Sequence, residues 1–298
     1  MTYTNASFWI CTFLFALFSI DALAQDTLGW NYAHQLYQKG AYQSAGIEFE
    51  RIIYQTNHPE WQAKASLQKA NCYKQMGLFW EGQKCLEKVN LMFLNDTFHY
   101  NVHHQAALCA YLGERWNDAE GHLVQMENFV KDSNLLAKST FLKVLVYNEQ
   151  ARWAEAKEIL LKWAVQKGKN TAERDSLKAL VEANYTKRKI PRLKNAKAAD
   201  RMSTIVPGLG QTYLGYPHEG ALSFLLVASS LTFAFYYSLW LEATYVTTFT
   251  VGSYFIQSFY YGNIRRTAFL AEKRNYKLTR KFNDPARQLV LALQHHGS

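Results

Sequence analysis

Residues 33–45 read Ala-His-Gln-Leu-Tyr-Gln-Lys-Gly-Ala-Tyr-Gln-Ser-Ala, and this stretch decides the fold because its pattern returns at a fixed interval of 37 residues. Four positions of the interval carry a similar small, apolar or aromatic residue in each of the four copies. The positions are Ala33, Ala70, Ala107 and Val144; Tyr42, Phe79, Trp116 and Trp153; Ala45, Gly82, Ala119 and Ala156; and Phe49, Leu86, Leu123 and Leu160. A small residue where two helices touch, with an aromatic and a large apolar residue beside it, predicts a series of stacked helix pairs.

The pattern resembles the tetratricopeptide repeat, a helix-turn-helix unit of about 34 residues. The resemblance covers 27–168, and residues 171–186 are expected to form a closing helix that covers the last repeat. The turn between paired helices needs a residue in the left-handed conformation, and glycine occupies this position in the first two copies. The four turn positions are Gly40, Gly77, Glu114 and Ala151.

The resemblance implies a binding function, in which the first helix of each pair lines a concave groove. Aromatic, amide and basic side chains at these positions suit an extended peptide or a protein partner. The residues expected to face the groove are His34, Tyr37, Lys64, Asn71, Lys74, Asn101, His104, Tyr111 and Lys138. The alternative is that these side chains are ordinary solvated positions and that the domain is a rigid spacer or binds through another face.

A second motif, Pro-Gly-Leu-Gly-Gln-Thr-Tyr-Leu-Gly at residues 207–215, precedes two uncharged runs at 220–241 and 243–264. Each run has 22 residues, and a helix of this length spans about 33 Å, which is enough for a hydrocarbon core of about 30 Å. We therefore expect a transmembrane hairpin. The motif resembles the C-terminal part of uncharacterised bacterial envelope proteins, through Pro207, Gly208, Gly210, Gln211, Tyr213, Gly215, Gly262 and Asn263.

The two ends of the chain and the charge distribution indicate export and contact with lipid. An apolar stretch at 8–20 precedes Ala22-Leu23-Ala24, which predicts a signal peptide cleaved after Ala24, although the absence of a preceding Lys or Arg leaves an uncleaved anchor open. The net charge is +9, but residues 26–186 carry 18 basic and 18 acidic side chains. Seven bases fall in 187–201 and seven in 265–281. This distribution favours anionic lipid headgroups as a partner and argues against nucleic acid.

The predicted fold class is all-α, a tetratricopeptide-like helical repeat solenoid followed by a transmembrane helical hairpin. The expected domains are a signal peptide at 1–24, repeats with a closing helix at 25–186, a basic linker at 187–202, the Pro/Gly turn and hairpin at 203–264, and a basic tail at 265–298. A positive-inside tendency would place both basic flanks in the cytoplasm, whereas the signal peptide places them outside it. We expect the bacterial inner membrane, with the repeat domain on the periplasmic side.

Catalytic and metal-binding motifs are missing from the sequence, so no enzyme, cofactor or metal is predicted. His99 and His103 have the spacing of a helical metal site, but further ligands are lacking and surface histidines are the preferred interpretation. Removal of the signal peptide leaves an odd number of cysteines. Cys72 and Cys85 are the pair for which a disulfide is considered.

The functional hypothesis from the sequence is a membrane-anchored scaffold of the bacterial cell envelope that binds partner proteins or peptides through its helical repeats. The alternative is an accessory subunit of a membrane transport or protein-insertion complex, which packs against a larger partner through the hairpin.

Overall fold

The computed structural model describes residues 29–240, 250, 252–254 and 257–297, and these residues form helices and connecting turns without a strand among them. The predicted all-α class is therefore confirmed for the described part of the chain. The expected signal peptide at 1–24 lies outside the described residues. Contacts divide the chain into unit 1, Met1–Val181 with Val290–Ser298, and unit 2, Glu182–Leu289.

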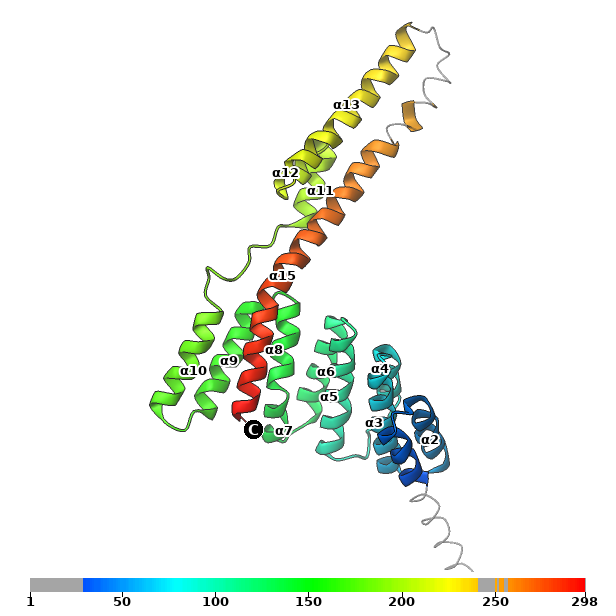
Figure 1. The fold of residues 1–298 in the computed structure, drawn as a ribbon, viewed down its shortest axis with the longest axis vertical. Helices are drawn as coiled ribbons and strands as arrows, with labels where there is room; N and C mark the ends of the chain where they lie inside the picture. The colour runs from blue at the N-terminus through cyan, green and yellow to red at the C-terminus, as the bar shows by residue number, and fades with distance from the viewer. Residues whose placement is uncertain (1–28, 241–249, 251, 255–256, 298) are drawn as a thin grey trace, which may run out of the picture. The chain divides into compact units, whose positions relative to one another are not determined.

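Most helices of unit 1 pack on their neighbours in sequence (Figure 1). A helix over residues 29–38 comes first. It is followed by α2 (Tyr42–Gln55), α3 (Pro59–Gln75), α4 (Phe79–Glu87), α5 (Asp96–Leu112), α6 (Trp116–Phe129), α7 (Ser133–Lys138), α8 (Thr140–Glu149), α9 (Trp153–Lys167) and α10 (Thr171–Asn184).

Four turns at intervals of 37 residues share one backbone geometry. Gly40 and Gly77 have φ of 78° and 74°, and Glu114 and Ala151 take the same left-handed conformation with φ of 57° and 59°. At each turn the following N–H reaches the carbonyl five residues back, as in Ala41 N to Leu36 O at 3.0 Å. This is the Schellman arrangement that ends a helix and reverses the chain. A residue other than glycine at the last two turns therefore raises the conformational free energy of the turn, but the turn keeps its geometry.

The small residues of the repeating pattern lie at helix contacts. Ala33, Ala45, Ala70, Ala107, Ala119 and Ala156 are fully buried, and the large residues one turn after the small positions, Phe49, Leu86, Leu123 and Leu160, are at most 1% exposed. A Cβ on Gly82 would lie 3.1 Å from Cys109 Sγ, so this glycine marks a close approach of α4 to α5. The period in the sequence thus corresponds to a repeated packing contact.

The fourth helix pair departs from the regular pattern. Its first helix is interrupted at Ser139, which separates α7 from α8. The hydroxyls of Ser139 and Thr140 donate to the carbonyls of Leu136 and Ala137 at 2.7 and 2.8 Å. Such side-chain bonds to the preceding turn compete with helical hydrogen bonds and bend or break a helix.

Unit 2 contains α11 (Ala196–Ile205), α12 (Leu209–Tyr213), α13 (Pro217–Trp240), a π-helix at Gln257–Tyr261 and the first part of α15 (Gly262–Gly297). Its small apolar core joins Ala199, Leu214, Leu270 and Ala271, with Tyr213 and Tyr216 packed against it. The described part of the expected basic tail, residues 265–297, belongs to α15.

The transmembrane hairpin predicted for 203–264 is wrong for the part of this segment that the structure describes. Among residues 29–240, 250, 252–254 and 257–297, no helix combines the length and the apolar character needed to cross a membrane. Uncharged side chains are not all apolar: α13 carries several Ser, Thr and Tyr residues and begins with His218 and Glu219. The second run includes the π-helix and joins the charged helix α15, and most of its earlier residues lie outside the described part.

The strained turn at Ala151 gives a stability prediction. An L-residue in the left-handed region costs about 1–2 kcal/mol, and glycine avoids most of this cost. We expect Ala151→Gly to raise the free energy of unfolding by roughly 1 kcal/mol, measured by urea unfolding with circular dichroism. The control Ala179→Gly, at an exposed position within α10, should lower it by about 1 kcal/mol. A loss of stability in Ala151→Gly would show that the left-handed turn is not strained.

Candidate functional site

The predicted groove residues fall into three groups in unit 1. Lys64 and Lys74 of α3 and His104 of α5 belong to a surface that we call the α3–α5 face. Lys64 Nζ lies 5.1 Å from the ring centroid of Trp61 and 6.0 Å from that of Phe98. Lys74 Nζ donates a hydrogen bond to Gln105 Oε1 across the two helices. The face is defined by Trp61, Lys64, Lys74, Phe98, His104 and Gln105.

Three other predicted residues have packing roles. The ring centroid of His34 lies 5.0 Å from Trp30 and 5.4 Å from Phe49. Tyr37 and Tyr111 pack against the aromatic residues that begin the next helices, and their ring centroids lie 5.2 Å from Tyr42 and 5.3 Å from Trp116. These side chains hold each helix pair together rather than project from it.

The remaining three predicted residues lie near the surface but are not joined to the α3–α5 face by a hydrogen bond. Asn71 is half-buried and donates from Nδ2 to Gln68 Oε1 at 3.3 Å, within α3. Asn101 is half-buried on α5, and Lys138 is exposed at the end of α7.

Burial sets the charge state of the α3–α5 face. It lowers the pKa of His104 to about 4, with a further contribution from the nearby charge of Lys74. Burial also lowers the pKa of Lys74. The His104 ring stacks on Tyr100, with ring centroids 5.2 Å apart. At neutral pH the face therefore presents a neutral imidazole beside the partly dehydrated ammonium group of Lys74.

In unit 2 the second motif is organised by the side-chain amide of Asn263, which is 3% exposed. Its Oδ1 accepts hydrogen bonds from Gly208 N at 3.0 Å and Gln211 Nε2 at 3.2 Å, and its Nδ2 donates to Ser203 O at 3.2 Å. The hydroxyl of Ser203 lies 2.8 Å from that of Thr267 and accepts from Gly210 N at 3.1 Å. The motif residues thus form a closed polar network that joins α11, α12 and α15.

The glycines of the motif allow backbone segments to meet. A Cβ on Gly208 would lie 2.0 Å from the carbonyl oxygen of Gly220, and a Cβ on Gly210 would lie 2.0 Å from that of Ala199. Gly208 and Gly215 also have φ of 85° and 90°. These three positions therefore require glycine for steric or conformational reasons.

The other motif residues complete the same core. Pro207 follows the end of α11, where an extended residue precedes it as expected before proline. The Tyr213 ring lies 4.3 Å from Lys194 Nζ, and the Leu214 carbonyl accepts a bond from Arg274 Nη1 at 2.6 Å. These contacts give the motif a structural role.

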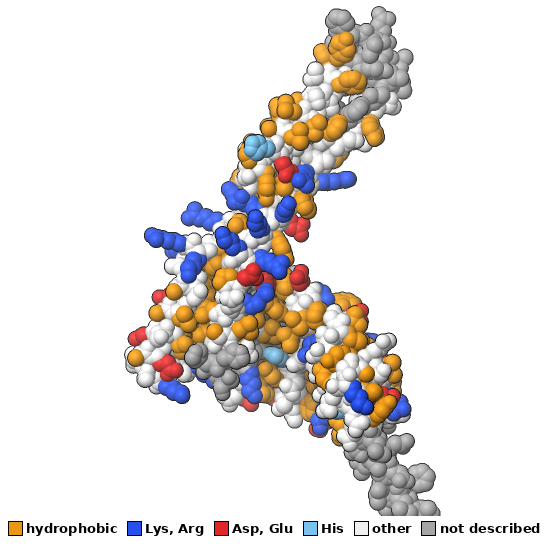
Figure 2. Space-filling view, viewed as in Figure 1, with side chains coloured by type: hydrophobic (Ala, Val, Ile, Leu, Met, Phe, Trp, Pro, Cys, Tyr) orange, Lys and Arg blue, Asp and Glu red, His pale blue; other side chains and the backbone are white. Residues whose placement is uncertain are grey.

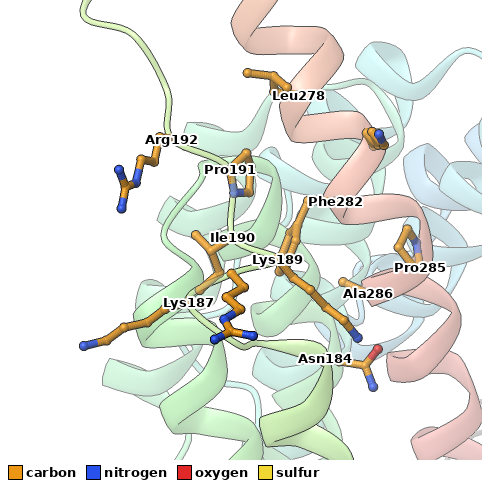
Figure 3. Close-up of a pocket in the computed structure, with 12 residues that line it drawn as sticks. Asn184, Lys187, Lys189, Ile190, Pro191, Arg192, Leu278, Phe282, Pro285 and Ala286 are labelled. Atoms are coloured by element: carbon orange, nitrogen blue, oxygen red, sulfur yellow. The ribbon is translucent and has the colours of Figure 1, made fainter.

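Unit 2 also contains a pocket of about 800 Å³, formed by the segment after α10 and by α15 (Figure 3). Its lining combines basic residues of 187–192 with Phe282, Pro285 and Ala286 of α15. Sequence reasoning recognised the basic segments but missed the pocket, because no local pattern shows that two segments far apart in sequence converge.

The remaining candidate groups from the sequence are the cysteines and the possible metal ligands. Cys72, Cys85 and Cys109 are free thiols, so the Cys72–Cys85 disulfide that was left open is not formed. Burial raises the pKa of Cys72 and of Cys109 to about 11, which keeps both thiols protonated. In the described part of the chain, no group of three or more His, Cys, Asp or Glu side chains is arranged to hold a metal ion.

Comparisons of the chain with protein-family models, with curated proteins and with solved structures give no match. The geometry of the chain itself therefore defines its class, which is an all-helical protein with a repeated helix-pair unit and a glycine-rich polar-core unit.

The polar core predicts effects of different size for two motif glycines. Gly210→Ala should lower the free energy of unfolding of unit 2 by about 3 kcal/mol or more, because the added Cβ meets the backbone of Ala199. Gly262→Ala is the matched control: no described atom lies within 4 Å of its Cβ, so its effect should stay below about 1 kcal/mol. Hydrogen exchange of α11 and α12 checks both, and equal protection in the two variants would contradict the close contact.

The buried histidines predict a pH dependence. Burial lowers the pKa of His103 and of His104 to about 4, and His122 and His99 add to the effect at His103. Because the unfolded value is about 6.5, the unfolded chain binds these protons more readily. Stability should be complete above about pH 6.5 and should fall as the pH decreases toward about 4.

Urea unfolding across this pH range measures the effect. His104→Gln should reduce the loss of stability between about pH 6.5 and about pH 4, because it removes one of the titrating groups. The control His58→Gln changes an exposed histidine and should leave the pH profile as it is. An unchanged profile in His104→Gln would contradict the inferred titration.

Proposed function

We propose that unit 1 is a protein-interaction scaffold that binds an extended segment of a partner protein along the α3–α5 face. The observation that carries the proposal is the arrangement of Lys64 over two aromatic rings, Trp61 and Phe98, which come from different helices. Aromatic and cationic side chains that are already packed lose little freedom on binding and are common anchors at protein interfaces.

The other residues of the face favour a peptide backbone as the ligand. Gln105 offers an amide, and its carbonyl oxygen is already engaged by Lys74. The neutral His104 ring offers one donor and one acceptor. A partner segment with acidic side chains would complement the two lysines, whereas its backbone would match the amide and imidazole groups.

The proposed location of the protein in the cell rests on its sequence. The apolar stretch at 8–20 and Ala22-Leu23-Ala24 support export to the periplasmic side of a bacterial inner membrane. A transmembrane anchor in 203–264 is not part of this proposal, because the described helices do not support it.

Selection of random peptides on the full chain tests the proposed face. Binding of the selected peptides should weaken by about tenfold or more in Lys64→Ala with Lys74→Ala, because truncation of an interface anchor typically costs more than about 1 kcal/mol. The control removes the same charge from exposed positions of α9 and α10, Lys162→Ala with Lys178→Ala, and should change affinity less than about twofold.

Equal losses in the two double variants would show that net charge alone governs binding. Undiminished binding in the Lys64 and Lys74 variant would place the peptide site elsewhere. Circular dichroism spectra of both variants should match that of the unchanged protein, so that a folding defect is recognised.

A further inference from the structure

The charged side chains that line the pocket in unit 2 are all basic. Its lining includes five basic residues and no acidic one: Lys187, Arg188, Lys189, Arg192 and Lys281. All five are exposed. Within the described part of the chain, none of them forms an ion pair with a carboxylate. Like charges held close together repel one another, so an anion that enters the pocket relieves this repulsion.

The backbone fixes the basic rim of the pocket. The N–H groups of Lys189 and Ile190 donate to the Thr186 carbonyl at 2.9 and 3.1 Å. This turn brings consecutive basic residues to the edge of the pocket, and Lys281 joins them from α15. The charge at the pocket is therefore built by a defined turn and a helix.

The pocket also has an apolar wall on α15. Phe282 is 8% exposed and Ala286 is 3% exposed, and the Tyr185 ring meets Phe282 edge-on with ring centroids 5.6 Å apart. Ile190 and Pro191 lie near these residues in the pocket (Figure 3). Pro285 lies inside the helix and lines the pocket. Since proline lacks an N–H, it cannot complete the helical hydrogen bond to the Lys281 carbonyl.

The combination of a basic rim and an apolar wall selects an amphiphilic anion. Inorganic phosphate would contact the bases and would make no use of the apolar side of the pocket. An extended acidic peptide would need a long groove, whereas this pocket is a local hollow of about 800 Å³. A phosphate group attached to a short apolar chain matches both parts of the lining.

A second feature of unit 2 favours a lipid as the source of this anion. Large apolar side chains are exposed along α13, including Leu222 at 59%, Leu225 at 62% and Phe235 at 67%. Figure 2 also shows Lys and Arg side chains gathered on unit 2, whereas on unit 1 they are interspersed with acidic ones. Exposed apolar surface together with clustered bases is the combination that binds the interface of anionic membranes.

We propose that this pocket binds the headgroup of an anionic phospholipid, with the phosphate among the basic side chains and the first acyl carbons against Phe282 and Ala286. The site is independent of the peptide-binding face in unit 1. It requires contact with a lipid surface and no membrane-spanning helix.

Sedimentation of the full chain with vesicles tests the proposal. Vesicles of phosphatidylcholine and phosphatidylglycerol in equal parts should bind the protein, and pure phosphatidylcholine should bind it far less. Each base near an anionic surface strengthens binding about fivefold, which amounts to about 25-fold for two bases at any place on the surface. Lys187→Gln with Lys281→Gln should weaken binding more than this, because it also removes the direct contacts of both bases with the phosphate.

The matched control removes two bases from the same basic segments but outside the pocket lining, Lys197→Gln with Lys277→Gln. It should weaken binding clearly less than the pocket variant. Equal losses would mean diffuse attraction to the surface and would overturn the proposed site, as would undiminished binding in the pocket variant.

Calorimetry of the full chain distinguishes the sources of the anion. A short-chain phosphatidylglycerol, kept below its micelle concentration, should bind more tightly than inorganic phosphate, and Lys187→Gln with Lys281→Gln should remove this binding. Equal affinities for the two would overturn the role of the apolar wall. Tighter binding of an oligoglutamate peptide, lost in the same variant, would make the pocket a peptide site and overturn the lipid assignment.

Discussion

The side-chain amide of Asn263 is the interaction on which unit 2 depends. It joins Gly208, Gln211 and Ser203 through three hydrogen bonds in a buried place. A buried polar group that loses its partner costs about 1–3 kcal/mol, so each member of the network is constrained by the others.

Unit 1 is stabilised in a different way. Its contacts are small residues at helix crossings, with aromatic and aliphatic side chains around them, and the same contact recurs in each helix pair. Polar groups are therefore free to occupy its surface, where they form the α3–α5 face. The two units thus differ in where they place their polar chemistry. Unit 2 has buried polar side chains in its core, and unit 1 carries them on its surface.

The sequence predicted local and periodic features well. The 37-residue interval located the four turns and the buried alanines, because each depends on residues close in sequence. The transmembrane prediction rested on a count of charges, which does not separate Ser, Thr and Tyr from apolar residues, and no described helix supports it. The pairing of Ser203 with Thr267 and of Glu219 with Arg266 joins distant segments, as does the pocket beside Phe282. Such convergence leaves no pattern in one sequence, so these features could not be predicted.

The repeated turns have a consequence for the order of folding. Each joins two helices that pack on one another, so the contacts of a pair close over short stretches of chain. Local contacts form quickly, and a repeat array can nucleate at one pair and extend to its neighbours. The first pairs can therefore fold while the rest of the chain is still being synthesised. The core around Asn263 can form only later, because the residues that bind its amide lie more than 50 residues before it in the sequence.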